Sequence, residues 1–447
     1  FSGHPLFATL QPGVLYPINL LLVLLPFDLA FNWTIIVHYA LAGIFTFALL
    51  REYRADAAGA LTGAIVFMLS GYLFSVHNVM STLFSAAWVP LAMLTHLRAI
   101  RRSSLAYAAA TALTLTVMFL GGGIEVLFAT LLLLFMASVY PPALLVDGFF
   151  RAGLLKRTGL FMLSVFLFLL LSAVQLLPFL ELADQSTRAG GLSFFEATTW
   201  SFGFKDFIQF FIPDPYGYGT TNDKYWSNQS WLKTVYLGTI PFVLACFFTM
   251  KRKNRAIVFT LTGLAFMILA LGSNTPVYQF LYDYLPFIGK IRYPVKFLLV
   301  PFLFMAIAAG LGLDALKDGC RAADKSTTRA SWALLGLATL AAISLGALDY
   351  LEPMVKEYLV AKGIDFPEYN RADINIFNAK RVLFFFVLST IAVYAGVKAR
   401  SGLLAAIMLV PLLTTDLFFA HNGYYHATPK NEYHAKGPVL ELLAKDA

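Results

Sequence analysis

Three cationic side chains that could bind an anion fall within one short stretch, LPFIGKIRYPVKF (285–297). Lys290, Arg292 and Lys296 lie there within seven residues of one another, among aromatic and aliphatic neighbours. For each cation alone, extension toward lipid headgroups is the structural alternative. Pro294 favours the first turn of a helix, where unpaired N–H groups and the positive end of the helix dipole attract anions. The stretch therefore predicts a site for a phosphate group at a membrane surface.

Other ionisable side chains close apolar segments and predict a wider candidate cleft. His77 ends one segment and Glu125 begins another, so both are expected at the same membrane surface. A divalent metal between them is one interpretation, but two ligands without a shared short motif are weak evidence, and structural hydrogen bonding is the alternative. Asp416 lies about one and a half turns inside the last apolar segment, and we expect it to face protein because burying an uncompensated charge is costly.

Two further groups of candidates have a structural and a functional interpretation each. Glu181 and Arg188 are seven residues apart, so on a continuous helix they share a face, either as a salt bridge or as substrate ligands. Asp214, Tyr216 and Trp226 lie in a long loop, where a carboxylate and aromatic rings could hold a sugar. The prolines and glycines around Asp214 also mark tight turns that it could cap.

The candidate residues must be held in place by secondary-structure elements, and the composition indicates that these elements are membrane helices. Of 447 residues, 59% are hydrophobic and 13% are charged, which is too few charges for the surface of an ordinary soluble protein. Apolar windows of roughly 17 to 25 residues recur along the chain, as transmembrane helices require. We predict twelve spans: 31–51, 56–76, 79–98, 104–121, 123–146, 157–181, 233–251, 255–272, 294–315, 331–350, 381–398 and 402–421.

The distribution of positive charge predicts the orientation of these spans. Short loops on one side carry 18 of the 33 Lys and Arg residues, and the positive-inside rule assigns that side to the cytoplasm. The net charge of +8 therefore indicates topology and not a nucleic-acid partner. The long loops, 182–232, 273–293 and 351–380, are expected outside, where loops of this length are usually functional.

The predicted organisation has three parts. Residues 1–30 are expected to form part of a first extracytoplasmic loop, with an interfacial segment at 15–28 that two prolines interrupt. Residues 31–421 form the transmembrane domain, and residues 422–447 begin an extracytoplasmic region. The chain begins with Phe1 and ends within an apparent helix, so we expect a fragment that lacks both termini, with both of its ends extracytoplasmic.

Several separated motifs resemble the bacterial YfhO-type membrane proteins. They are QPGVLYPINLLL (11–22), SAAWVPL (85–91), QLLPFLELADQSTRAG (175–190), IPDPYGYG…YW…VYLG (212–238), and the stretch 285–297. The resemblance spans essentially the whole chain. It implies an all-α polytopic bundle of the GT-C type with long extracytoplasmic loops, located in the bacterial inner membrane. Where the family commonly has an acid shortly before YLG, this chain has Lys233.

The same resemblance implies a glycosyltransferase. Its donor would be a sugar on a polyprenyl phosphate and its acceptor a glycan of the cell envelope, with Lys290, Arg292 and Lys296 on the lipid phosphate. GT-C enzymes carry a catalytic Asp or Glu in the first external loop, and Asp28 is the acid that this chain offers there. We expect the catalytic carboxylate to lie outside the sequence. The alternatives are a transporter or flippase of lipid-linked sugars, and a non-catalytic envelope-assembly protein.

Overall fold

The computed structural model describes residues 5–140, 153–186, 189–213, 215, 231–285, 288–361, 371–424 and 429. Within these ranges the chain forms helices joined by loops, and no strand. The α-helices are α1 (Leu20–Leu24), α2 (Phe27–Glu52), α3 (Ala57–Met68), α4 (Gly71–Ser75), α5 (Met80–Ala86), α6 (Val89–Arg102), α7 (Leu105–Leu120), α8 (Ile124–Val139), α9 (Leu154–Asp184), α10 (Phe194–Ala197), α11 (Thr239–Lys251), α12 (Lys253–Ala270), α13 (Pro276–Tyr284), α14 (Leu299–Arg321), α15 (Lys325–Ala361), α16 (Arg371–Lys398) and α17 (Gly402–His421). Shorter 3-10 helices are η1 (Pro17–Asn19), η3 (Phe204–Phe210), η4 (Gly272–Asn274), η5 (Ile288–Lys290), η6 (Pro294–Leu298) and η7 (Asn422–Tyr424).

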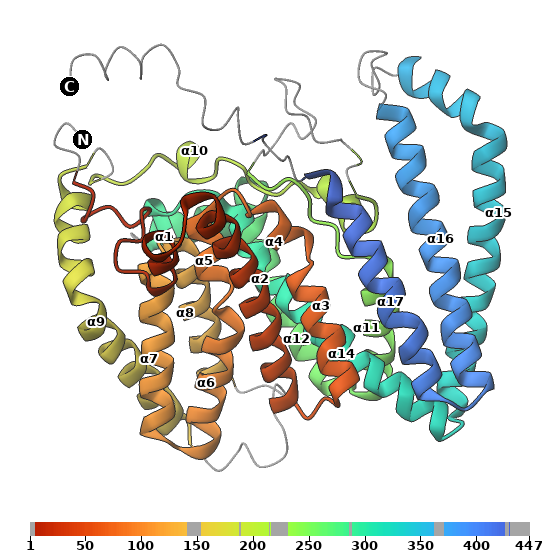
Figure 1. Ribbon diagram of the computed structural model, residues 1–447, viewed down its shortest axis with the longest axis horizontal. Coiled ribbons are helices and arrows are strands. Elements are labelled where there is room, and N and C mark those ends of the chain that lie inside the picture. Colours follow the sequence, from red (N-terminus) through yellow and green to blue (C-terminus); the bar gives the residue numbers. More distant parts are fainter. Residues whose placement is uncertain are drawn as a thin grey trace.

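The long helices stand side by side in one bundle (Figure 1). Among the described residues, nine helical segments are long and apolar enough to cross a membrane, and α7, α8 and α11 are shorter apolar helices. The expectation of an all-helical, multi-pass membrane protein is therefore confirmed.

Helix α14 forms the centre of the bundle because small residues allow its neighbours to approach closely. In the span that contains α14, 89% of the most apolar window is buried, against 17% in the span of α15. A Cβ atom on Gly59 would lie 2.6 Å from the carbonyl oxygen of Gly310, and a Cβ on Gly310 would lie equally close to the oxygen of Gly59. Small residues at such crossings are typical of membrane helix pairs.

The second and third predicted spans are each interrupted near their predicted outer ends. Between α3 and α4 the helix stops at Leu69, and the Ser70 side chain caps α4 by accepting from the backbone N–H of Leu73. Between α5 and α6 the chain turns at Ala87–Trp88, and Pro90 stands in the first turn of α6. These breaks leave backbone groups for other segments to pair with.

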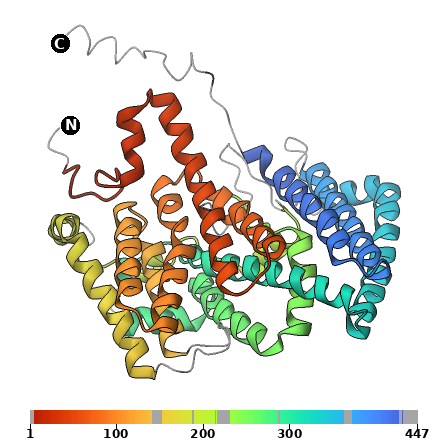
Figure 2. The same ribbon diagram turned by 60° about the horizontal axis from the view of Figure 1, so that its bottom comes forward.

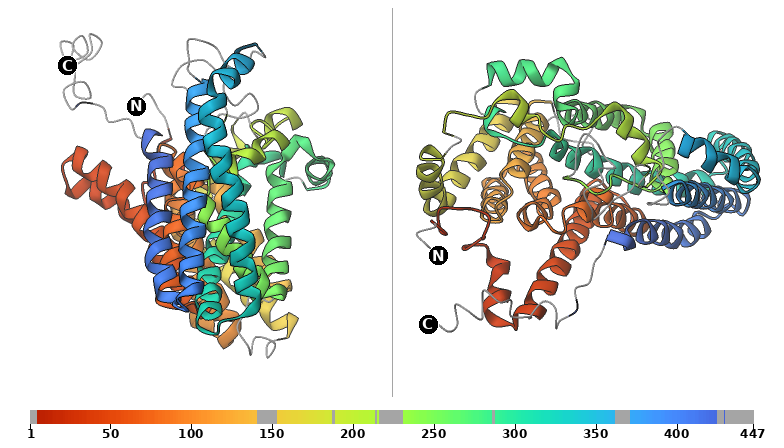
Figure 3. Two further views of the ribbon diagram at one scale, coloured as in Figure 1. Left: turned by 90° about the vertical axis from the view of Figure 1, so that its right-hand side faces the viewer. Right: turned by 90° about the horizontal axis from the view of Figure 1, so that it is seen from above.

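Both predicted boundaries of the loop 351–380 are wrong. Residues 351–380, expected as a loop, are helical at both ends, because α15 runs to Ala361 and α16 begins at Arg371. Ion pairs join the two helices there: Lys380 lies 2.6 Å from Asp349 and 2.8 Å from Glu352, and Lys356 pairs with Asp373. At 37 residues, α15 is about 55 Å long, which exceeds the hydrocarbon core. Figure 3 shows this helical pair as a distinct unit at one side of the bundle.

The predicted span 233–251 starts too early. Residues 233–238 are not helical, and α11 begins at Thr239. The backbone N–H groups of Lys233 and Thr234 instead donate to the Ser75 hydroxyl, at 2.9 and 2.8 Å. At the interruption before α4, the N–H of Gly71 donates to the carbonyl oxygen of Tyr236 at 3.0 Å, so segment 231–238 pairs with both ends of α4.

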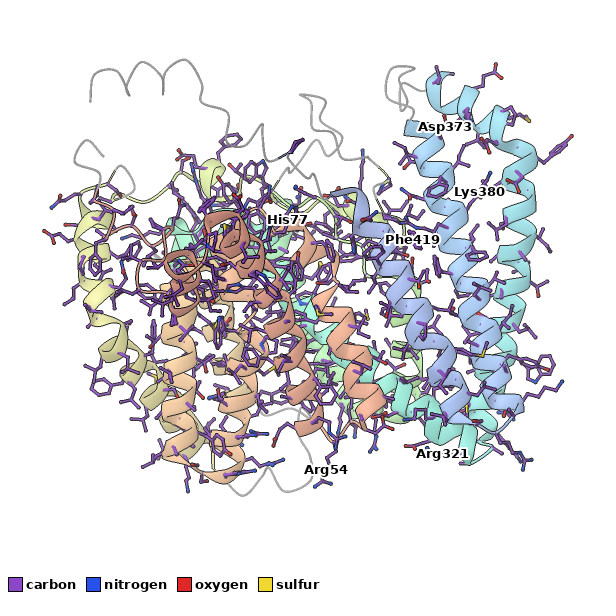
Figure 4. The ribbon with its side chains drawn as sticks, viewed as in Figure 1. Arg54, His77, Arg321, Asp373, Lys380 and Phe419 are labelled. Atoms are coloured by element: carbon purple, nitrogen blue, oxygen red, sulfur yellow. The ribbon has the colours of Figure 1, made fainter. Side chains whose placement is uncertain are left out.

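Side chains at the two ends of the bundle separate as the charge pattern predicts. In Figure 4, His77 and Asp373 lie toward one end, and Arg54 and Arg321 toward the other.

The segment 15–28 contains only the short helices η1 and α1 ahead of α2, and α1 projects from the bundle (Figure 2). Its side chains Val23 and Leu24 are 80% and 75% exposed.

Candidate functional site

Lys296 lies at the centre of the candidate site. It stands in η6, immediately before α14, with only 9% of its side chain exposed. Its Nζ atom lies 2.7 Å from Oε1 of Glu125, which is in the first turn of α8. The ammonium group also lies 5.0 Å from the ring centre of Trp231 and 4.9 Å from that of Tyr293. The fold thus joins two predicted site residues, 171 positions apart, in a partly buried ion pair within an aromatic cage.

Arg292 and Lys290 lie in more open settings than Lys296. The Arg292 side chain is 28% exposed, and its Nη2 atom lies 3.8 Å from Oε1 of Glu196. Its Nε atom is buried and has no hydrogen-bond partner within the described part of the chain. Lys290 is exposed at the end of η5. The three cations therefore differ in burial and partners, and do not form one uniform cluster.

Two aromatic residues beside Arg292 adopt a backbone conformation that bulky residues rarely take. Tyr293 has φ 69° and Trp200 has φ 59°, both in the left-handed region. Their rings pack together with centres 4.2 Å apart and planes inclined by 33°. Strained residues of this kind persist only where the surroundings hold them, and they cluster at functional sites. The pair joins the loop after α10 to the start of η6, directly beside the cations.

Segment 231–238 begins with Trp231 of the candidate site and also contains Tyr236, which contacts Asp416 of α17. The Tyr236 hydroxyl donates to both carboxylate oxygens of Asp416 at 3.0 Å, and the N–H of Thr239 donates to Oδ2 at 3.4 Å. Asp416 is fully buried, so the expectation that it faces protein is confirmed. Burial and the neighbouring Asp416 carboxylate raise the pKa of Tyr236 well above its usual range, so it remains a hydrogen-bond donor.

The remaining predicted residues fall outside this arrangement or outside the described ranges. His77 follows α4, and its Nδ1 atom lies 2.6 Å from the carbonyl oxygen of Phe74. Glu181 is exposed on α9, which ends at Asp184, so the continuous helix that would place it on one face with Arg188 does not form. The other predicted residues lie outside the described residues: Arg188, Asp214, Tyr216 and Trp226.

Sequence reasoning missed four residues that the fold brings to the site: Trp200, Trp231, Tyr293 and Glu196. Tyr293 had a usable signal, because it stands between Arg292 and Pro294 in the motif already singled out. Trp231 also lies within the motif 212–238 that resembles the YfhO-type proteins, a few residues after Trp226. Trp200 and Glu196 had none, since their contacts depend on how a loop folds back over η6.

No grouping of three or more His, Cys, Asp or Glu side chains that could hold a metal ion occurs within the described ranges. The carboxylate of Glu125, one of the two predicted metal ligands, is paired with Lys296 instead. The metal interpretation of His77 and Glu125 stays a prediction.

No family model matches the chain and no curated protein matches it, so the resemblance to YfhO-type proteins rests on the motifs alone. Similar solved structures include ArnT from Cupriavidus metallidurans bound to undecaprenyl phosphate, at 14% identity and TM-score 0.43, covering 88% of this chain and 62% of that one. The apo state of ArnT matches with the same identity and score, covering 93% and 65%. The chain spans under two thirds of the length of these structures, and at this similarity neither the ligand nor the activity of ArnT carries over to it.

Proposed function

We propose that the protein is a membrane glycosyltransferase of the GT-C type, which transfers a sugar from a polyprenyl-phosphate donor to an extracytoplasmic glycan of the cell envelope. One observation carries the proposal. The ring of Tyr293 contacts Arg292, Trp200 and Lys296, and Lys296 in turn contacts Trp231 and the Glu125 carboxylate, at the predicted outer end of a membrane helix bundle. This combination provides a group for each part of a phosphate-linked sugar.

The cations suit the phosphate. Arg can bind two phosphate oxygens through parallel N–H bonds, and Arg292 has a buried Nε without a partner in the described structure. Lys290 adds a solvent-exposed charge, and Lys296 adds one that is shielded from water and therefore acts more strongly. Such groups stabilise the negative charge that develops on a departing lipid phosphate.

The aromatic residues suit the sugar. The rings of Trp200 and Tyr293 are packed against each other, and the pair is partly exposed. Their strained backbone fixes the ring positions relative to Arg292. A sugar stacked against this pair would place its anomeric carbon near the cations, as the transfer reaction requires.

The interrupted spans favour one alternative, a transporter or flippase of lipid-linked sugars. Discontinuous helices are typical of transporters, where they form binding sites near the bilayer midplane. The breaks at Leu69–Ser70 and Ala87–Trp88 lie nearer the predicted outer end, because α3 and α6, on the predicted inner side, are longer than α4 and α5. A surface position favours the transferase.

The test is release of prenyl phosphate from a panel of farnesyl-phosphate hexoses, using purified full-length protein with membrane glycans as acceptor. We expect release that depends on acceptor and that falls when Lys296 is changed to Met. A Lys325→Met variant at the opposite end of the bundle is the matched control and should be fully active. Absence of release from every donor, with folded protein and intact lipid binding, would reject the transferase.

A further inference from the structure

We propose that Glu125 is the general base of the transfer reaction and that Lys296 holds it in an inactive ion pair until a donor phosphate binds. The inference rests on the proposed function. It also reverses an expectation from the sequence, which located the catalytic carboxylate outside this chain.

The position of Glu125 fits a base. Its side chain is 25% exposed, so a substrate hydroxyl can reach it, whereas the Lys296 side chain beside it is only 9% exposed. The carboxylate stands in the first turn of α8, close to the N-terminus of that helix. Oε1 contacts Lys296 at 2.7 Å.

Several other external acids of the described ranges have structural tasks. Glu196 accepts from the backbone N–H and hydroxyl of Ser193 in a capping box. Asp206 is buried and accepts from the N–H of Gly203 at 2.7 Å. Asp416 is fully buried against Tyr236, so a substrate cannot reach it. Glu125 is held by a cation, Lys296, at 2.7 Å, which an incoming anion can draw away, whereas the short hydrogen bonds of Glu196 come from Ser193.

The exchange of partners follows from charge. In the structure Lys296 and Glu125 neutralise each other. A donor phosphodiester brings one negative charge, and Arg292 and Lys290 supply positive charge on the same side. When the ammonium of Lys296, on its flexible four-carbon arm, turns to the phosphate, Glu125 loses its counter-ion. A carboxylate without a neighbouring cation accepts a proton more readily.

The reaction then proceeds in one balanced step. The acceptor oxygen forms a bond to the anomeric carbon, and its proton passes to the Glu125 carboxylate. The bond between the anomeric carbon and the phosphate oxygen breaks, with its electron pair remaining on the phosphate. Lys296 and Arg292 stabilise the resulting prenyl phosphate, and the base becomes active only when the leaving group is in place.

The test separates binding from turnover. Glu125→Gln keeps the size of the side chain and an oxygen for Lys296, but it cannot take the proton. We expect its affinity for farnesyl phosphate to be equal to or several-fold higher than that of the wild type, and its release of prenyl phosphate to fall by about 10²- to 10⁴-fold. Asp318→Asn, at an exposed acid near the other end of α14, is the matched control and should retain near-normal turnover.

A second variant excludes a purely structural role. Glu125→Gly should be inactive and should regain part of its turnover in added sodium formate, since a small carboxylate can occupy the vacated space. If Glu125→Gln stays within threefold of wild-type turnover, or if formate restores nothing to a folded Glu125→Gly, the base assignment is wrong. If the wild type itself releases no prenyl phosphate from any donor, the proposed function fails instead, and the assignment fails with it.

Discussion

Substitution of Arg292 tests the phosphate site in the most detail, because geometry and charge can be varied separately there. Arg292→Lys keeps the charge but loses the planar fork that can bind two oxygens at once. Arg292→Ala removes both. If the side chain holds a lipid phosphate, the conservative variant must already lose much of the affinity, whereas a side chain that only extends toward headgroups would tolerate Lys.

The size of the effect follows from the setting of the side chain. Arg292 is 28% exposed, its Nε is buried, and its carboxylate neighbour Glu196 is 3.8 Å away, too far for a strong bond. A hydrogen bond to a charged group contributes about 1.5 to 3 kcal/mol, so Arg292→Ala should weaken binding by about ten- to a hundredfold. Arg292→Lys, which loses the paired geometry alone, should weaken it by about tenfold.

The assay is equilibrium binding of farnesyl phosphate to purified full-length variants, compared at equal folded yield. Glu196→Gln is a control for which the expected change in affinity has the opposite sign to that of the Arg292 variants. Exposed ion pairs contribute about 0 to 1 kcal/mol, so removing this competing carboxylate should tighten binding by no more than about fivefold. Wild-type affinity in both Arg292 variants, with a loss only of expression in Arg292→Ala, would refute the phosphate site.

Three further predictions concern the surrounding structure. Asp416→Leu leaves the Tyr236 hydroxyl buried without its acceptor, at a cost of about 1 to 3 kcal/mol, so its melting temperature should fall clearly below that of Asp416→Asn; equal melting temperatures would contradict this. A Cβ on Gly312 would overlap the carbonyl oxygen of Leu244, so Gly312→Val should lower the folded yield in detergent, while Gly336→Ala, with nothing within 4 Å, should not. A cysteine introduced at Phe195 should react with an impermeant thiol reagent on intact cells and one at Arg252 should not; the reverse pattern would invert the topology.

Composition and charge pattern were sufficient for the architecture of the bundle. Helices at membrane length follow from apolar windows, and the residues at each end of the bundle separate as the basic loops predict, as Arg54 and His77 illustrate. The ends of α15 and α16 were missed because the contacts that join them, including ion pairs, link residues far apart in the sequence. A single sequence does not show that Lys380 meets Asp349 and Glu352.

The site was only partly predictable. The cationic stretch and Glu125 were recognisable as separate features at membrane-helix ends. Their contact was not, because it joins residues far apart in the chain and depends on the crossing of α8 with the start of α14. Likewise, nothing in the local sequence predicts the positive φ of Trp200 and Tyr293, since it is tertiary packing that overrides their backbone preference.

The most direct test of the central claim is to follow bond cleavage and lipid movement together in proteoliposomes that contain the full-length protein and a fluorescent farnesyl-phosphate hexose, with membrane glycans supplied as the acceptor. A transferase predicts that the bond between sugar and phosphate breaks at the predicted outer face, and that cleavage slows by at least tenfold in Arg292→Ala. Movement of the intact donor across the bilayer, without cleavage and with equal rates in the wild type and Arg292→Ala, would contradict it.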